Sequence, residues 1–133
     1  MDNTVSEKIE IYLSCRNLKD LDVFSKSDPY VRISYRRDFL QKQYSLLGRT
    51  ETIANNLNPN FVKTFTLDYI FESRQDIKFD VFDDDNNGDK DDFLGTVETT
   101  IGALMGARGQ TSILDLKNPS NPNQPAGKLV VRC

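Results

Sequence analysis

The sequence predicts an all-β fold, an eight-stranded antiparallel β-sandwich that forms a single domain over residues 1–133. Short runs in which apolar and polar residues alternate recur along the chain, as expected of strands with one buried face. The connections between these runs are rich in Asn, Asp, Gly and Pro. None of them has the pattern of a long amphipathic helix, which argues against alternating parallel βαβ units.

The first run shows the strand pattern plainly, with Ile9 and Ile11 alternating with charged residues. Gly48, inside the third run, indicates a bulge or a turn. Residues 101–109 hold at most a helical turn because they contain three glycines, and residues 117–128, with three prolines, are a loop by composition. The eight expected strands are residues 8–15, 29–37, 43–53, 61–67, 76–82, 93–101, 112–116 and 128–132.

The composition excludes several classes of protein. The only cysteines, Cys15 and Cys133, belong to no zinc pattern, and reduced thiols in a cytoplasmic protein are the simplest interpretation. The N-terminal residues lack the basic and apolar regions of a secretion signal, and no apolar run is long enough to cross a bilayer. A net charge of −3 argues against nucleic acid as a partner and predicts repulsion from an anionic membrane.

Aspartates concentrate in two of the predicted loops. The connection between the first two strands holds Asp20, Asp22 and Asp28, and residues 83–92 hold six more aspartates. If both loops leave the same end of the sandwich, their carboxylates share one small space. Two carboxylates ~4 Å apart repel each other by roughly 4 kcal/mol at an effective dielectric constant near 20. A hard cation bound through oxygen would compensate, and calcium tolerates the irregular geometry of a two-loop site.

A helix-loop-helix calcium motif does not explain this cluster. Asp83, Asp85 and Gly88 match the start of that motif, but its twelfth position is Leu94 instead of glutamate. The residues before Asp83 alternate as a strand does, not as an entering helix does. The remaining alternative is that both loops are simply solvated, because aspartate and asparagine are common turn formers.

Three stretches resemble the landmarks of a known family, in the same order. They are LDVFSKSDPYV at residues 21–31, NPNF at residues 58–61, and FDVFDDD followed by DDFLG within residues 79–95. On these motifs the chain resembles a C2 domain, the calcium- and lipid-binding β-sandwich, with the strand order of the circularly permuted type II topology. Residues 49–72 and the late PAGK are similar to the first C2 module of the copines. That family also carries a second C2 module and a von Willebrand A-type domain, so the chain would be a fragment or a free-standing relative.

The resemblance implies a set of calcium ligands. It places Asp22 and Asp28 in the first loop and Asp83 and Asp85 in the third. The aspartate that closes the third loop falls on Asp92, with Asp91 as its rival, because this loop is one residue longer than in the best-known members. Whether two or three calcium ions bind stays open for the same reason.

A second set of residues is expected to contact the membrane. Val23 and Phe24 lie at the tip of the first loop, where they either enter the bilayer interface or pack back on the loop. Arg36, Arg37 and Lys42 fall where related domains often keep a lipid-binding basic patch. The alternative for these three is that they only solvate the outer face of a sheet.

Charge explains how calcium would act. The two loops hold nine aspartates and three lysines, a formal charge of −6, which two calcium ions reduce to −2 and three to zero. That change removes the repulsion from anionic, phosphatidylserine-like phospholipid. The function predicted is calcium-dependent phospholipid binding, which carries a cytosolic protein to the plasma membrane or other membranes when calcium rises.

Two functions of other classes compete with this one. The first is a calcium-independent protein-interaction or scaffold C2 domain with a structural or vestigial metal site, and protein partners stay open in either case. The second is a metal-dependent phosphoryl-transfer enzyme. The chain has no histidine, no P-loop and no placed nucleophile, so we do not expect it to be an enzyme.

Overall fold

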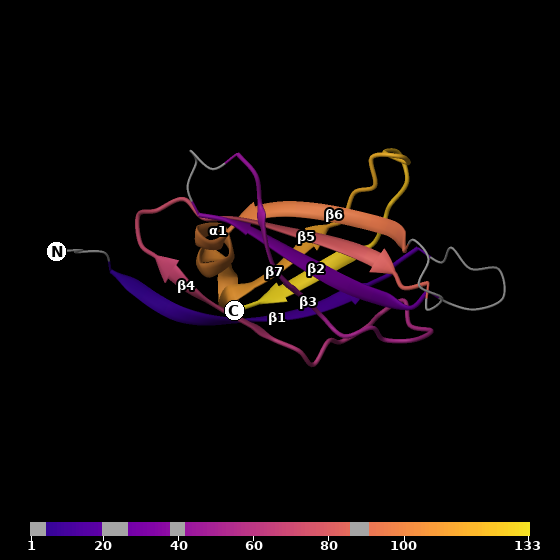
Figure 1. Ribbon diagram of the computed structural model, residues 1–133, viewed down its shortest axis with the longest axis horizontal. Coiled ribbons are helices and arrows are strands. Elements are labelled where there is room, and N and C mark those ends of the chain that lie inside the picture. Colours follow the sequence, from indigo (N-terminus) through magenta and orange to yellow (C-terminus); the bar gives the residue numbers. More distant parts are fainter. Residues whose placement is uncertain (1–4, 20–26, 38–41, 86–90) are drawn as a thin grey trace.

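The computed structural model describes residues 5–19, 27–37, 42–85 and 91–133. In these residues two four-stranded antiparallel sheets pack face to face (Figure 1). One sheet has the order β4-β1-β8-β7 and the other β3-β2-β5-β6. The strands are β1 Ser6–Arg16, β2 Pro29–Arg36, β3 Ser45–Arg49, β4 Phe65–Ile70, β5 Asp76–Asp83, β6 Asp92–Thr100, β7 Thr111–Asp115 and β8 Lys128–Arg132. The predicted eight-stranded sandwich is confirmed.

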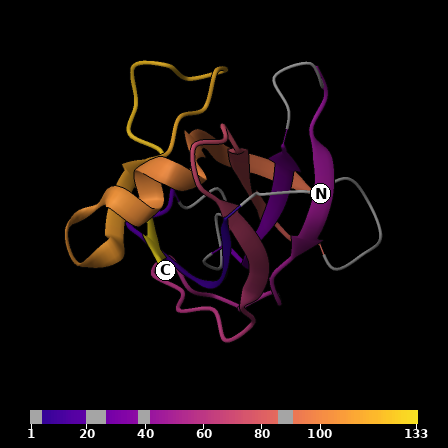
Figure 2. The ribbon, with the colours of Figure 1, turned by 90° about the vertical axis from the view of Figure 1, so that its left-hand side faces the viewer.

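The alternating residues of the strands form the core between the two sheets. Ile77, Phe79 and Val81 of β5 have no exposed surface, and Ile11 of β1 is equally buried. Burying such a side chain contributes about 1.5–3 kcal/mol. Figure 2, which looks along the strands from the end that holds α1, shows the two layers side by side.

The order of strands agrees with the type II topology that the resemblance implied. The last strand, β8, lies beside the first, β1, and runs antiparallel to it. β1 leads directly into the first acidic loop, and β2 begins where that loop ends. The beginning of β2 is therefore at the same end of the sandwich as the end of β1.

The third and fourth strands are shorter than predicted. Residues 50–53 and 61–64 were expected to be strands, but β3 ends at Arg49 and β4 begins at Phe65. The Glu51 side chain is one physical reason, because its carboxylate accepts the backbone N–H groups of Val62 and Lys63 at 2.6 and 3.2 Å. The Glu51 carboxylate therefore binds backbone N–H groups that a neighbouring strand would otherwise have paired. The predicted irregularity at Gly48 is present, since the register shifts beside its partner Ile33.

A short helix follows β6, where only a helical turn was expected. α1 spans Ile101–Gly106 and is followed by a 3-10 turn, η1, at Arg108–Gln110. The Thr100 side chain accepts the N–H of Ala103 and so caps α1, while Ile101 and Leu104 are buried. Within the described ranges, no helix is long and apolar enough to cross a membrane.

An ion-pair network joins the end of β2 to the start of β5. Asp76, only 5% exposed, accepts from Arg36 Nε and Nη2 at 3.0 and 2.8 Å and from Arg74 Nε at 2.9 Å. Burial of Asp76 raises its pKa, but the bonds from the two arginines outweigh burial and hold this pKa below its ordinary 3.8. The fold therefore favours the ionised carboxylate.

Asp76→Asn is expected to lower the free energy of unfolding by about 2 kcal/mol at neutral pH, because it weakens hydrogen bonds to a charged group. A lowered pKa contributes stability that is complete above the ordinary value and is lost as pH falls through the lowered one. The difference between wild type and variant is thus expected to vanish well below pH 3.8. Urea unfolding at neutral and at acidic pH measures it, and a difference that persisted in acid would contradict this explanation.

Candidate functional site

The described parts of the two acidic loops lie at the same end of the sandwich. Asp28 immediately precedes β2, Asp83 ends β5, and Asp92 begins β6. The sheet pairs Pro29 with Asp83, and Asp83 with Asp92, so three strand ends stand next to one another. We call this end of the molecule the acidic rim; it is the right-hand end of Figure 1.

Hydrogen bonds join three connections at the acidic rim. These are the first loop, between β1 and β2, the middle loop, between β3 and β4, and the third loop, between β5 and β6. Asp28 N–H donates to Asp83 Oδ1 at 2.8 Å, and Asp84 N–H donates to the Asp28 carbonyl at 2.9 Å. Asn55 N–H, from the connection between β3 and β4, donates to Asp28 Oδ1 at 2.7 Å. Backbone donors thus hold two carboxylates at the junction of all three loops.

Strand register decides which side of the sheet each aspartate occupies. Asp83 continues the alternation of Phe79 and Val81, whose side chains face the other sheet, and it is only 4% exposed. Asp92 is the cross-strand partner of Asp83, and cross-strand partners share a face. Both aspartates therefore lie on the inter-sheet side. A register shift after Val81 makes this possible, because it adds one residue to β6.

Asp91 lies on the opposite face. Its Oδ2 accepts the hydroxyl of Tyr30 at 2.5 Å, and its Oδ1 accepts the N–H of Asp85 at 3.0 Å. Chiefly because of the bond from the Asp85 backbone, and then that from Tyr30, the pKa of Asp91 is below its ordinary value. Burial, followed by the bond to Asp91, raises the pKa of Tyr30 to about 12. The proton therefore stays on Tyr30 and the charge on Asp91.

Sequence reasoning missed four residues that support the acidic rim. No role at the loops was predicted for Tyr30, Thr52, Asn55 or Arg49. Thr52 donates its hydroxyl to Asp84 Oδ2 at 2.7 Å, and Arg49 Nη2 lies 3.9 Å from the same oxygen. The position of Tyr30 inside SDPYV was the only available signal. Thr52 and Asn55 belong to the connection from β3 to β4, Arg49 ends β3, and the path of this segment depends on the tertiary fold.

Several predicted residues lie outside the described ranges: Asp22, Val23 and Phe24 of the first loop. In the parts of the chain that the structure describes, no three carboxylates, cysteines or histidines are grouped closely enough to hold a metal ion. The carboxylates of Asp28, Asp83 and Asp91 each accept hydrogen bonds from the protein. The type of ligand atom still fits a hard cation, because the aspartates at the acidic rim offer only oxygen atoms.

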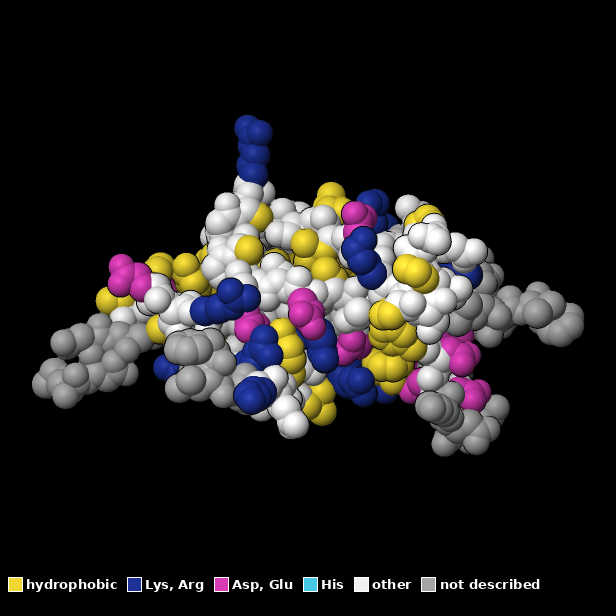
Figure 3. All heavy atoms as spheres, turned by 90° about the horizontal axis from the view of Figure 1, so that it is seen from above, with side chains coloured by type: hydrophobic (Ala, Val, Ile, Leu, Met, Phe, Trp, Pro, Cys, Tyr) yellow, Lys and Arg dark blue, Asp and Glu magenta, His cyan; other side chains and the backbone are white. Residues whose placement is uncertain are grey.

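The predicted basic residues lie away from the acidic rim. Arg36 is the last residue of β2, and a strand of eight residues extends roughly 23 Å from Pro29. Its guanidinium pairs with Asp76, lies 4.5 Å from the centre of the Tyr44 ring and donates to the Lys42 carbonyl at 3.0 Å. Arg37 and Lys42 are exposed beside it. In Figure 3 acidic side chains gather at the right-hand end, and most basic ones lie over the middle and left.

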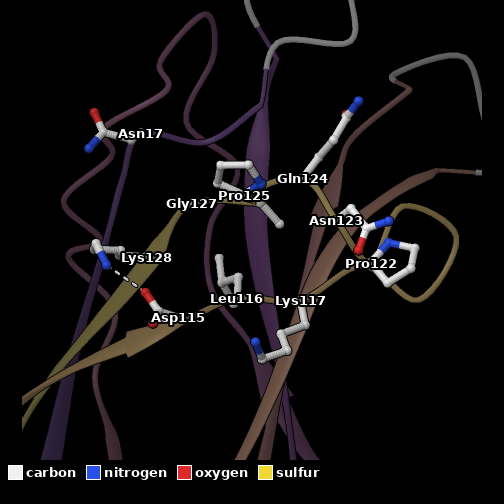
Figure 4. A pocket seen from close by; sticks show the side chains of 11 residues that line it. Asn17, Asp115, Leu116, Lys117, Pro122, Asn123, Gln124, Pro125, Gly127 and Lys128 are labelled. Carbon is white, nitrogen blue, oxygen red and sulfur yellow. Dashed lines mark hydrogen bonds and ion pairs between the residues drawn. The ribbon is translucent and has the colours of Figure 1, made fainter.

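A pocket lies beside the acidic rim, between the end of β1 and the connection from β7 to β8 (Figure 4). It measures about 400 Å³, and Leu116 and Ala126, both buried, lie among its lining residues. Lys19 Nζ donates to Gln124 Oε1 at 2.8 Å, which ties this connection to the start of the first acidic loop. Of the predicted calcium ligands that the structure describes, none lines the pocket.

Comparisons with known proteins identify the family. The family model described as "C2 domain" matches residues 8–116. Copine-E of Dictyostelium discoideum is 41% identical over 114 residues, and Copine-A of the same organism 37% identical over 126 residues. These matches cover 83% and 95% of the chain, which spans only 20% of either relative.

A solved structure supports the fold. A C2 domain of plant Extended Synaptotagmin 1 superimposes with a TM-score of 0.73, at 19% identity, over 93% of this chain and 89% of that one. At this identity the likeness concerns the fold alone. Together with the family match and the copine relatives, it confirms the resemblance found in the sequence: the chain belongs to the C2 domain family.

Proposed function

We propose that the chain is a calcium-dependent phospholipid-binding module that docks on anionic membranes through the acidic rim. The observation that carries this proposal is the direct contact between the first and third loops, in which Asp28 N–H donates to Asp83. Two acidic segments separated by 55 positions in the sequence thereby share one end of the molecule. Clustered carboxylates of this kind repel one another unless a cation compensates them.

The proposed ligands come from both loops. Asp28, Asp83 and Asp85 would hold calcium together with Asp22, as the family pattern implies. Asp92 completes the set in preference to Asp91, because Asp92 shares the inter-sheet face of Asp83 and both oxygens of Asp91 already accept hydrogen bonds. Bound calcium would supply positive charge and open coordination positions for lipid phosphate.

The membrane contact proposed here is limited to the acidic rim. Val23 and Phe24, at the tip of the first loop, are proposed to enter the interface beside the carboxylates. Arg36, Arg37 and Lys42 do not take part in the same contact, because β2 separates Arg36 from the rim by its whole length. The ion pair with Asp76 gives Arg36 a role in stability instead.

Residues 1–133 are proposed to act as one such module, resident in the cytosol at low calcium and bound to membranes at high calcium. The chain matches only 20% of the length of each copine relative, so any activity of theirs outside the C2 region is not transferred to it. We propose no catalytic role, since the family match concerns a binding module and no histidine or placed nucleophile accompanies the carboxylates.

Liposome co-sedimentation tests the proposal. Vesicles containing phosphatidylserine are expected to pellet the protein with calcium and to leave it in the supernatant with chelator, whereas pure phosphatidylcholine vesicles pellet far less in either condition. Asp85→Asn and Asp92→Asn are each expected to abolish the calcium-dependent part. Asp68→Asn is the matched control, because it removes the same charge from an exposed position on β4.

The same assay separates the rival function. Equal pelleting with calcium and with chelator would favour a calcium-independent scaffold and overturn the proposal. Loss of pelleting in Asp68→Asn as well as in Asp85→Asn would show that net charge matters and that the acidic rim does not.

A further inference from the structure

Asp91 links the third loop, which connects β5 to β6, to the body of the sandwich. One of its oxygens accepts the N–H of Asp85, so the two described ends of the loop are bonded to each other. Its other oxygen accepts the hydroxyl of Tyr30, which belongs to β2. We call this chain of two hydrogen bonds the Tyr30–Asp91–Asp85 clasp. It connects a loop that carries calcium ligands to a strand that does not.

The Tyr30 side chain is fixed on both sides of its ring. It stacks on Phe82 with ring centres 5.5 Å apart and planes 20° apart, and the Arg49 guanidinium lies 3.5 Å from the ring centre. Tyr30 is only 6% exposed. Stacking and cation–π contacts of this kind restrict the ring, so its hydroxyl is held at one position. A rigid donor of this type can determine where the carboxylate of Asp91 lies.

The side chains of Tyr30 and Asp91 lie on the face of the sheet opposite to Asp83 and Asp92. Tyr30 and Phe82 are register partners on the outer face, whereas Asp83 and Asp92 lie on the inter-sheet side. Asp91 is adjacent to Asp92 in the chain. Its Oδ1 atom accepts the N–H of Asp85 and so fixes the backbone there. Holding Asp91 therefore fixes the backbone positions of two proposed ligands without placing Asp91 among them.

We propose that Tyr30 is a positioning residue for calcium binding, which acts through Asp91 to present Asp85 and Asp92 in a preformed arrangement. This inference rests on the proposed function, because it assigns a role at the same calcium site. Asp91 is then an anchor of the third loop and not a calcium ligand. A preformed loop binds more tightly because less conformational freedom is lost when the ligand binds.

Removing the Tyr30 hydroxyl is expected to weaken calcium binding. In Tyr30→Phe the ring contacts with Phe82 and Arg49 remain possible, but Asp91 loses its bond to β2. A hydrogen bond to an ionised acceptor is strong enough that its loss predicts a dissociation constant about tenfold higher. Tyr35→Phe is the matched control: it removes a hydroxyl from the same strand, near the opposite end, where Tyr35 accepts a hydrogen bond from Gln75.

Calorimetric titration with calcium of wild type, Tyr30→Phe, Asp91→Ala and the double variant tests the mechanism. If Tyr30 acts through Asp91, the losses in the two single variants are expected not to add in the double variant. Additive losses, or an unchanged dissociation constant in Tyr30→Phe, would overturn the proposal. So would a complete loss of binding in Asp91→Ala with normal binding in Tyr30→Phe, since Asp91 would then be a ligand itself.

Amide hydrogen exchange in chelator gives a readout that does not depend on calcium. The Asp85 amide is expected to exchange slowly in wild type and Tyr35→Phe and faster in Tyr30→Phe and Asp91→Ala. If wild type binds no calcium, the proposed function fails, and the assignment of Tyr30 to calcium binding fails with it. The exchange rate of the Asp85 amide would still decide whether the clasp exists. Equal rates in all four proteins would show that it does not.

Discussion

In a large excess of calcium, each bound ion is expected to raise the melting temperature of the chain by about 10 °C. A ligand at about 100 times its dissociation constant stabilises the folded state by about 2.7 kcal/mol for each site, and in a domain of this size 1 kcal/mol shifts the melting temperature by about 4 °C. The physical reason is the relief of repulsion among aspartates that three strand ends bring together. Calorimetric melting in calcium and in chelator, at matched ionic strength, measures the shift.

Two variants and a potassium chloride control distinguish calcium binding by the proposed ligands from screening of charge by salt. Asp92→Asn is expected to melt at or above the wild-type temperature in chelator, because it removes one of the repelling charges, and to lose most of the calcium shift. Asp91→Asn is expected to keep most of that shift, because we do not assign Asp91 as a ligand. An equal shift in potassium chloride of the same ionic strength would mean that the acidic rim responds to screening and not to a bound ion.

Gly127→Ala is expected to lower the free energy of unfolding by about 3 kcal/mol, through backbone strain and a steric clash. Gly127 has a φ of +101°, which side chains rarely adopt, and an added Cβ would lie 2.9 Å from the carbonyl oxygen of Asn17. The neighbouring carbonyl of Arg16 would be 3.0 Å away. Both neighbours are backbone atoms at the end of β1, so they cannot move as a flexible side chain would.

Gly102→Ala provides the control for this substitution. Gly102 lies in α1, and an added Cβ there meets nothing within 4 Å. The same chemical change is therefore expected to stabilise the protein by about 0.5–1 kcal/mol, since alanine favours helix more than glycine does. Urea unfolding of both variants measures the contrast, and equal effects at the two positions would contradict the steric explanation.

Strand positions could be predicted from the sequence wherever one face of a strand is buried. The alternation of Ile77, Phe79 and Val81 specified β5, and the same signal placed β1 and β2. The limits of β3 and β4 could not be predicted in this way, because the carboxylate of Glu51 binds backbone groups that a strand would have paired. Competition between a side chain and a sheet partner depends on the tertiary fold.

At the acidic rim, spacing predicted the cluster but not its internal arrangement. Asp28 and Asp83 were expected together and lie in direct contact. The proposal of Asp92 in preference to Asp91 depends on the register shift of β6, which decides which of these two neighbours shares the face of Asp83. The basic residues were expected where related domains keep a lipid-binding patch, and Arg36 lies at the end of β2 that is far from the acidic rim, because that strand runs the length of the sandwich.

The direction of the first and last strands in the sequence has a consequence for how such a module can be tethered. β1 begins at Ser6, at the end of the sandwich away from the acidic rim, and β8 runs toward that same end before stopping at Arg132. The start of β1 and the end of β8 therefore both face away from the carboxylates, as the course of the indigo and yellow strands in Figure 1 shows. In a longer protein, domains that continue in those directions would lie on the side of the module opposite to the acidic rim, and the acidic rim would stay accessible.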